Sequence, residues 1–217
     1  MKRSIARILT THCGSLARPK DLLDMMRAQV TGEPHDHEAY ARRVRSAVAE
    51  IVRKQIESGI DVPTDGEQGK LGFYAYVSER LTGVEPRPGT RPTPFAAELA
   101  AFPEYYKQYF SQAMLGGAIA PIVPLVCTGP IRYRGDEAVR RDIDNLKAAL
   151  AGVQPEDVFM PAVAPSGVGT NAHYRTEEEY LQAVAEAMRA EYRAIVDAGF
   201  LVQVDDPFLT DFTVIRP

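Results

Sequence analysis

The chain has 217 residues, of which 45% are hydrophobic and 25% charged, and its formal net charge is −4. This composition is typical of a globular protein and excludes a disordered or fibrous chain. Lys and Arg alternate with acids instead of clustering, so the sequence also argues against nucleic-acid binding.

The two cysteines, Cys13 and Cys127, are too few for a disulfide framework and fit a reducing compartment, although a single bridge stays open. Arg7 interrupts the apolar run near the start, so the opening residues do not resemble a secretory signal. No apolar stretch approaches the ~20 residues that a bilayer-spanning helix needs. We therefore expect a cytoplasmic protein.

The first half of the chain alternates short apolar runs with helical patterns. Pro19 suits the first turn of a helix, and Gly59 suits the position just after one. The predicted elements are, in order, a strand at 5–11, a helix after residue 19, a helix at 38–58, a short strand opening into a turn at 60–67, and a helix at 71–81. The proline-rich segment 83–103 predicts an irregular excursion from the main body.

The second half continues the alternation. Thr176 and Glu179 form a capping-box pattern at the start of a long helix, and Gly152 and Gly199 suit helix ends. The predicted elements are a buried strand at 120–130, a helix at 136–152, a strand running into a glycine-rich loop at 157–169, a helix at 176–199, and a last strand at 200–209.

Strands that alternate with long helices predict an α/β protein with a parallel sheet. We count about five such strands, each ending in a polar cluster, and in α/β proteins the chemistry gathers at these strand ends. Two architectures remain open, an open doubly wound sheet and part of an eight-stranded barrel. Five strands of a barrel would leave two unpaired edges.

Two acids at strand ends are the first site candidates. Gly66 permits a tight turn that presents Glu67, and Pro207 stiffens the turn that follows Asp205. Such acids suit a substrate ammonium, but each could also simply cap a turn. Neighbouring His12 and Cys13 make a poor zinc pair, because adjacent side chains on a strand point to opposite faces.

The loop 164–174 could bind an anion through backbone amides or be a plain connection. It lacks the spacing of a phosphate-binding loop, no GxGxxG follows the first strand, and no GxSxG nucleophile elbow is present. The sequence therefore gives no support to a nucleotide-binding fold or a serine hydrolase.

Five motifs, in this order, carry a family resemblance that runs across essentially the whole chain: "TTHCGSLARP", "DVPTDGE", "TGPIRYRG", "FMPAVAPSGVG" and "EYRAIVDAGFLVQVDDPFL". Together they resemble the cobalamin-independent methionine synthases, namely their catalytic barrel and its stand-alone relatives. The resemblance implies a partial TIM-type (β/α)8 barrel over residues 1–217, completed by another chain. It also implies methyl transfer from a methyltetrahydrofolate-type donor to a zinc-bound thiol such as homocysteine.

The resemblance assigns residue roles. Cys13, Gly14 and Ser15 correspond to the turn that contacts the amino-acid end of the thiol substrate. Glu67 matches an acid beside the thiol and the metal, and Asp205 matches the acid that grips the substrate amino group. On the methyl-donor side lie Asp211 and Ser166. These assignments make Glu67 and Asp205 the predicted catalytic residues.

The zinc ligands of the family lie on strands after the fifth, beyond this sequence, so the resemblance assigns no metal ligand here. Three hypotheses follow: a subunit of a split methyltransferase whose partner supplies the last strands and the zinc, a non-catalytic binding or scaffold protein, and a truncated product. Relatives also alkylate other small acceptors, and Cys13 in the thiol-site turn keeps an alkyltransferase with a different acceptor open.

Overall fold

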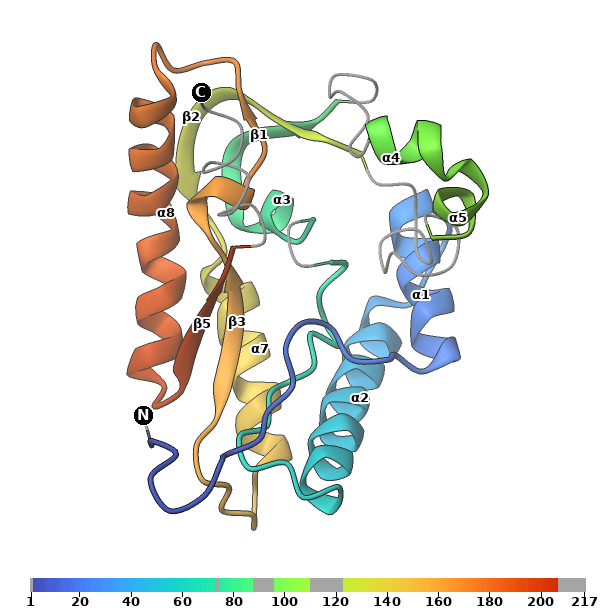
Figure 1. The fold of residues 1–217 in the computed structure, drawn as a ribbon, viewed down its shortest axis with the longest axis vertical. Coiled ribbons are helices and arrows are strands. Elements are labelled where there is room, and N and C mark those ends of the chain that lie inside the picture. The colour runs from blue at the N-terminus through green and yellow to red at the C-terminus, as the bar shows by residue number, and fades with distance from the viewer. Residues whose placement is uncertain (1, 73–74, 88–95, 110–122, 207–217) are drawn as a thin grey trace.

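The computed structural model describes residues 2–72, 75–87, 96–109 and 123–206 (Figure 1). Its α-helices are α1 (Lys20–Thr31), α2 (His37–Glu57), α3 (Val77–Arg80), α4 (Ala96–Ala101), α5 (Pro103–Gln108), α7 (Asp136–Ala149) and α8 (Glu177–Asp197). Its strands are β1 (Leu81–Pro86), β2 (Leu125–Tyr133), β3 (Phe159–Val163), β4 (Thr170–Asn171) and β5 (Leu201–Asp205), and a short 3-10 helix, η2, covers Pro165–Gly167.

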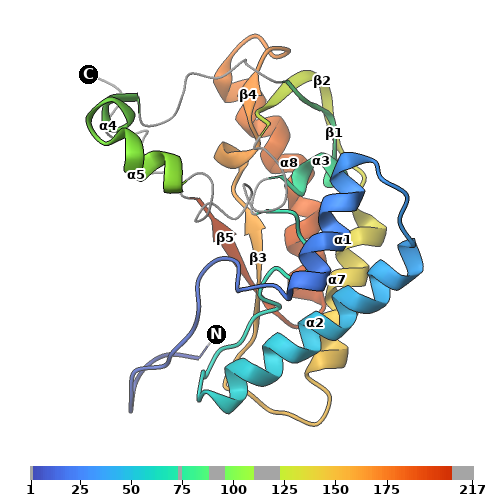
Figure 2. The same cartoon turned by 90° about the vertical axis from the view of Figure 1, so that its right-hand side faces the viewer.

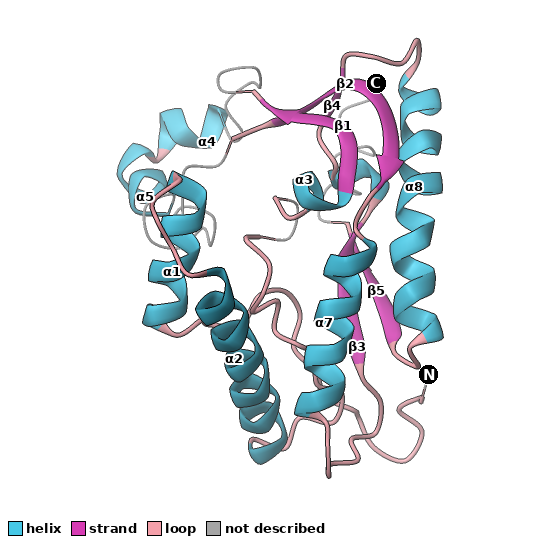
Figure 3. Cartoon of the chain, turned by 180° about the vertical axis from the view of Figure 1, so that it is seen from behind, coloured by secondary structure: helices cyan, strands magenta, loops and turns pink. Residues whose placement is uncertain are grey.

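A series of parallel segments forms the part of the fold that carries the site. β3 and β5 pair in parallel from Phe159 opposite Leu201 to Val163 opposite Asp205. A parallel bridge joins Thr64 to Phe159, and another joins segments 8–11 and 60–64 at Thr11 and Val62. The predicted strands at 5–11 and 60–67 are therefore present only as isolated bridges. Helices α2, α7 and α8 lie side by side over one face of this series (Figure 3).

The predicted strand at 120–130 does not join the parallel series, which corrects the expected five-stranded order. Its described part, β2, pairs antiparallel with β1 and parallel with the short β4, in a separate sheet. Figure 2 shows β1 and β2 apart from β3 and β5. The sequence pattern fails here because β1 contains Gly83 and Pro86, which indicate irregular chain more often than strand.

The excursion predicted at 83–103 is wrong at both of its described ends. Residues up to Pro86 belong to β1, and α4 begins at Ala96. Between them, residues 88–95 lie outside the described part of the chain. The helix predicted at 71–81 is confirmed only as the single turn α3, and residues 73–74 within it are not described.

The long helices begin and end where their capping residues predict. Thr176 accepts a hydrogen bond from the backbone amide of Glu179 at the start of α8. Gly59 and Gly152, just beyond α2 and α7, have φ of 77° and 83°, the left-handed conformation that favours glycine. None of the described helices is both long and apolar enough to cross a membrane.

Two apolar clusters hold these layers together. One joins α1, α2 and α7 to β3, around residues such as Leu22, Val52 and Leu146. The other packs β1 and β2 against α8, around Leu81, Cys127 and Met188. β3 contributes to both clusters, so the strand that ends at the site is fixed from two sides.

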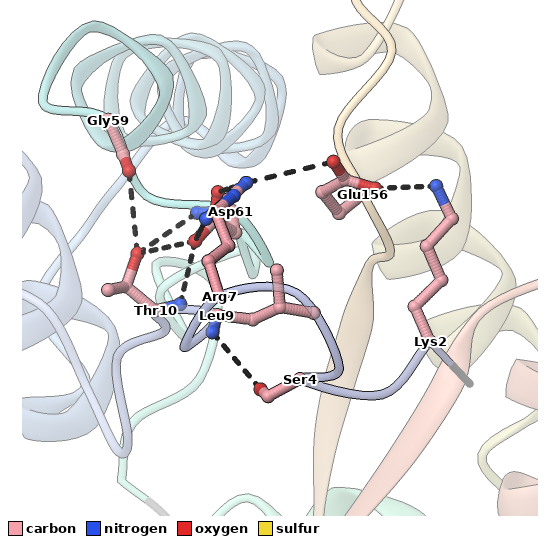
Figure 4. Close-up of polar contacts among 8 residues, drawn as sticks. All are labelled: Lys2, Ser4, Arg7, Leu9, Thr10, Gly59, Asp61 and Glu156. Carbon is pink, nitrogen blue, oxygen red and sulfur yellow. Dashed lines mark hydrogen bonds and ion pairs between the residues drawn. The ribbon is translucent and has the colours of Figure 1, made fainter.

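Ionic contacts attach the N-terminal segment to one end of the parallel series, the end opposite Val163 and Asp205 (Figure 4). Arg7 donates to both carboxylate oxygens of Asp61, at 2.7 and 2.5 Å, and the side chain of Lys2 donates to Glu156 at 2.6 Å. The hydrogen bond from Arg7 is the main reason why the pKa of Asp61 lies well below its usual range. These contacts hold residues 2–10 beside the segment that leads to the 64–67 turn.

Candidate functional site

The turn at 64–67 presents Glu67 in a conformation that its neighbours impose. The side chain of Gln55 on α2 hydrogen-bonds both the amide and the carbonyl of Thr64, at 3.1 and 2.8 Å. The Asp65 carboxylate accepts the amide of Glu67 at 2.9 Å. Gly66 and Glu67 both have positive φ, 63° and 55°. Among the described residues, Glu67 is the one non-glycine residue with a positive φ. A non-glycine residue in this region is uncommon and often marks a functional position.

The Glu67 side chain is buried, and one of its two carboxylate oxygens has a hydrogen-bond partner among the described residues. It is 1% exposed, and its Oε2 accepts the Ser15 hydroxyl at 2.5 Å. Its Oε1 has no hydrogen-bond partner in the described part of the protein. Buried carboxylate oxygens are normally paired, so Oε1 is ready to accept a donor from a ligand. Ser15 and Glu67, which the family resemblance assigns to the thiol substrate, are therefore in direct contact, and their role toward a substrate stays a prediction.

Arg18 and Gly14 fix the segment that carries Ser15. Arg18 is 9% exposed, and its guanidinium donates to the carbonyls of Glu67 and Lys70, each at 2.7 Å. Burial is the largest influence on its pKa, which it lowers. Gly14 has φ of 74°, which a side chain would strain. Cys13 is exposed, and its sulfur accepts a contact from the Gln203 amide at 3.6 Å.

Asp205 comes to the site from the last residue of β5. Burial raises the pKa of its carboxyl, the neighbouring Asp206 raises it further, and Lys70 opposes them. Asp206 accepts the hydroxyl of Ser166 at 2.8 Å. Ser166 is thus held at the same end of the parallel series, although its predicted role toward a methyl donor stays a prediction. Asp211 lies outside the described residues.

Glu67 and Asp205 line one small pocket, together with Lys70, Tyr76 and residues 161–163 of β3. The pairing of the two acids across 138 positions of sequence results from the bridge at Thr64 and Phe159 and from the parallel pairing of β3 and β5. The sequence-based expectation that the "DGE" and "VDDP" clusters share one face is confirmed. Such a pair of acids can bind an ammonium or orient a proton donor.

Residues that the sequence-based predictions do not include form the wall behind this pocket. The Tyr76 hydroxyl donates to Glu191 on α8 at 3.0 Å and accepts the Val163 amide at 3.0 Å. Burial is the main reason why the pKa of Tyr76 is raised well above its usual value, and Glu191 adds to it. Arg80 donates to Asp142 at 2.5 Å, and its Nε lies 3.7 Å from Glu191. We call Tyr76, Arg80, Asp142 and Glu191 the buried polar cluster.

A zinc site is not assembled by the described residues. No group of three or more His, Cys, Asp or Glu side chains among them lies close enough to hold a metal ion. Cys127 is buried on β2, where its sulfur donates to the carbonyl of Gly129 at 3.3 Å and burial raises its pKa. The described residues alone therefore do not fit the metal that the family resemblance implies.

Comparisons with known proteins agree with the motifs, although no family model matches the chain. It is 26% identical to the methionine synthase of Sulfolobus acidocaldarius, over 95% of this chain and 54% of the relative. It is 23% identical to that of Saccharolobus solfataricus, over 92% of this chain and 53% of the relative. The chain thus spans about half the length of the curated relatives it matches.

Two solved structures show the same fold. One is a B12-independent methionine synthase from Shewanella sp. W3-18-1 in complex with selenomethionine, at 17% identity and a TM-score of 0.65, covering 95% of this chain and 55% of that one. The other is a putative vitamin-B12 independent methionine synthase from Listeria monocytogenes, at 18% identity and a TM-score of 0.61, covering 97% and 56%. The chain is thus similar to methionine synthases over about half of their length, and its fold is α/β and corresponds to part of their barrel.

Proposed function

We propose that the chain forms the amino-acid-binding part of a methyltransferase that transfers a methyl group from a folate-type donor to a thiol such as homocysteine. The observation that carries the proposal is the Glu67 carboxylate, 1% exposed, with one oxygen fixed by Ser15 and the other without a partner in the described structure. The homology to methionine synthases supports the reaction class.

The residues of this chain then act on the substrate's amino-acid end. Glu67 and Asp205 line the same pocket and are both acceptors when ionised, so an ammonium placed there is held between them. Fixing the ammonium orients the attached thiol, which is the contribution of positioning to the rate. In the transfer itself, the thiol loses its proton, the sulfur–methyl bond forms while the methyl–nitrogen bond of the donor breaks, and the donor nitrogen takes the electron pair and, in the overall balance, the proton that the thiol lost.

A further polypeptide supplies the rest of the active site in this proposal. The chain spans about half of the relatives, and its described residues do not assemble a metal cluster. The zinc that activates the thiol in the family would therefore be held by residues on the further polypeptide, with the remaining barrel strands. Zinc, when bound, lowers the pKa of a thiol so that it reacts as a thiolate.

Methyl transfer by the full chain, purified together with any polypeptide that binds it, tests the proposal. The assay follows methionine formed from homocysteine and isotopically labelled methyltetrahydrofolate, by mass spectrometry. Glu67→Gln should lower the rate by about 100-fold, the loss expected when a substrate-positioning group fails. Glu33→Gln, at an exposed acid after α1, is the matched control and should keep the wild-type rate.

Two outcomes would refute the proposal. The first is that the assembled protein transfers no methyl group to homocysteine or to any other thiol supplied. The second is that Glu67→Gln turns over as fast as the wild type, which would show that the pocket takes no part in the reaction. A different acceptor would appear as transfer to another thiol in the same assay. Exposed Cys13, in the turn expected to meet the acceptor, makes that outcome chemically reasonable.

A further inference from the structure

The end of β3 is held by side chains, not by a strand, on one of its two edges. Toward β5 the pairing is continuous from Phe159 to Val163, whereas on the other edge the described chain provides only the isolated bridge between Thr64 and Phe159. There the amide of Phe159 donates to the carbonyl of Pro63 at 3.3 Å. The backbone groups beyond Phe159 on this edge need other partners, because a buried amide or carbonyl is costly to leave unpaired.

Two tyrosine hydroxyls meet the backbone of Val163, which is 1% exposed. The Val163 amide donates to the Tyr76 hydroxyl at 3.0 Å, and the Val163 carbonyl accepts the Tyr192 hydroxyl at 2.6 Å. An amide can only donate, so the single proton of the Tyr76 hydroxyl points to Glu191, at 3.0 Å. Tyr76 therefore supplies an acceptor and Tyr192 a donor, which are the two groups that the backbone of a neighbouring strand would supply.

The peptide unit between Val163 and Ala164 connects these tyrosines to Asp205. Its carbonyl accepts from Tyr192, and its amide donates to the backbone carbonyl of Asp205 at 2.9 Å. Because a peptide unit is planar and stiff, fixing its carbonyl also fixes the direction of its amide. Val163 lies opposite Asp205 in the pairing of β3 with β5. The last residue of β5 is thus held through the backbone at the end of β3.

We propose that Tyr76 and Tyr192 are positioning residues, which act through the backbone at the end of β3 to set the place of Asp205. The inference rests on the proposed function for its bearing on methyl transfer, because Asp205 is the acid that the proposed function places at the acceptor. The competing explanation is that the Tyr76 hydroxyl serves only to pair the buried carboxylate of Glu191.

Three Tyr→Phe variants of the full chain separate the two explanations, because each removes one hydroxyl and little else. Tyr76→Phe and Tyr192→Phe each free one backbone group of Val163. Tyr133→Phe is the matched control, since the Tyr133 hydroxyl donates to the same Glu191 at 2.9 Å and not to β3. Circular dichroism and the urea midpoint establish that each variant is folded. If one of the two test variants does not fold, the other decides in the same way.

Amide exchange, followed by NMR on the isotopically labelled chain, measures the end of β3 directly. The Val163 amide should exchange about 10-fold faster in Tyr76→Phe, the effect of one lost hydrogen bond, and at the wild-type rate in the control. The Ala164 amide should exchange faster in Tyr192→Phe. The rate of the Phe159 amide, at the other end of β3, corrects for any global loss of stability.

The Asp205 carboxyl reports its own position. Burial raises the pKa of this carboxyl, so a displaced and better hydrated carboxyl should titrate closer to its ordinary value. Carbon NMR should show this decrease in Tyr76→Phe and Tyr192→Phe but not in the control. In the methyl-transfer assay, kcat/KM for homocysteine should fall by about 10-fold in the same two variants, since misplacing a positioning group can cost up to about 100-fold.

Three results would overturn the proposal. One is an unchanged titration of Asp205 in both test variants. Another is the same decrease in Tyr133→Phe, which would trace the effect to Glu191 alone. The third is a wild-type kcat/KM in both Tyr76→Phe and Tyr192→Phe. If the titration of Asp205 shifts as expected but the wild type transfers no methyl group, the proposed function fails and the positioning of Asp205 stands.

Discussion

The buried polar cluster offers a sharp test of how the pocket wall is stabilised. The Arg80 side chain is 2% exposed, and the carboxylates of Asp142 and Glu191 beside it are 6% and 1% exposed. Replacing Arg80 with Met keeps much of the apolar stem and removes the charge. Two carboxylates would then lie in the interior without the cation that compensates them.

The expected loss is large relative to the stability of a domain. Breaking a buried ion pair by removing one partner costs about 3–5 kcal/mol, out of the roughly 5–15 kcal/mol that a native protein has in total. For a chain of 217 residues, each kcal/mol lowers the melting temperature by about 2–4 °C, so Arg80→Met should lower it by about 6–20 °C. The urea midpoint should fall in proportion.

Urea and thermal unfolding, followed by circular dichroism because the chain has no Trp, measure this loss. Arg141→Met is the matched control: Arg141 faces the same Asp142 at 3.7 Å but is 50% exposed, and an exposed pair contributes at most about 1 kcal/mol. Glu191→Gln should cost less than Arg80→Met, because it removes one of two carboxylates around a single cation. A loss below about 1 kcal/mol for Arg80→Met, or a larger one for Glu191→Gln, would refute the reasoning.

Two further variants test the strand pair and the turn. Gly83 has φ of 79°, and a Cβ there would lie 2.6 Å from the carbonyl oxygens of Gly129 and Pro130. Gly83→Ala should therefore lower the free energy of unfolding, measured in urea, by about 2 kcal/mol or more. An unchanged urea midpoint would exclude this close approach. Burial raises the pKa of Asp65, so the neutral form of its carboxyl is favoured in the folded state. The stability that this neutral carboxyl contributes is fully present below its unfolded pKa of about 3.9. That stability is lost as the pH rises through the folded pKa. The melting temperature of Asp65→Asn minus that of the wild type should therefore increase from pH 4 to pH 8, and a difference that is constant or decreases with pH would contradict the shift.

The sequence predicts the helices well because their ends are marked locally. Thr176 and Gly59 specify the boundaries of α8 and α2 through contacts within a few residues. The pairing of β1 with β2 is different, because it depends on contacts across some 40 to 50 positions and on a bulge at Gly83. A glycine that enables a bulge and a glycine that interrupts a strand look the same in one sequence, so the sequence predicts irregular chain at 83–86, where the structure has the end of β1.

The residues of the candidate site also divide into those that the sequence predicts and those that it does not. Glu67 and Asp205 follow apolar runs and are predicted from that position, whereas Ser15 is predicted by the family resemblance. The structure brings Ser15 to Glu67 and places Glu67 and Asp205 in one pocket. Glu191 was missed, although it occupies the apolar stripe of α8 between Met188 and Ile195. An acid in the register of an apolar stripe is the signal that predicts a buried, paired carboxylate.

The two acids of the pocket are positioned by separate halves of the chain, and the described residues join those halves. Glu67 is fixed by α2 and the 64–67 turn, whereas Asp205 is fixed by the pairing of β5 with β3. Lys70 connects them, because its ammonium donates to Pro161 in the middle of β3. The proposed amino-acid site is therefore set by contacts within this chain. Under the proposed function, binding of an amino acid and transfer of a methyl group should separate experimentally, because the described residues do not assemble the metal site that the transfer requires.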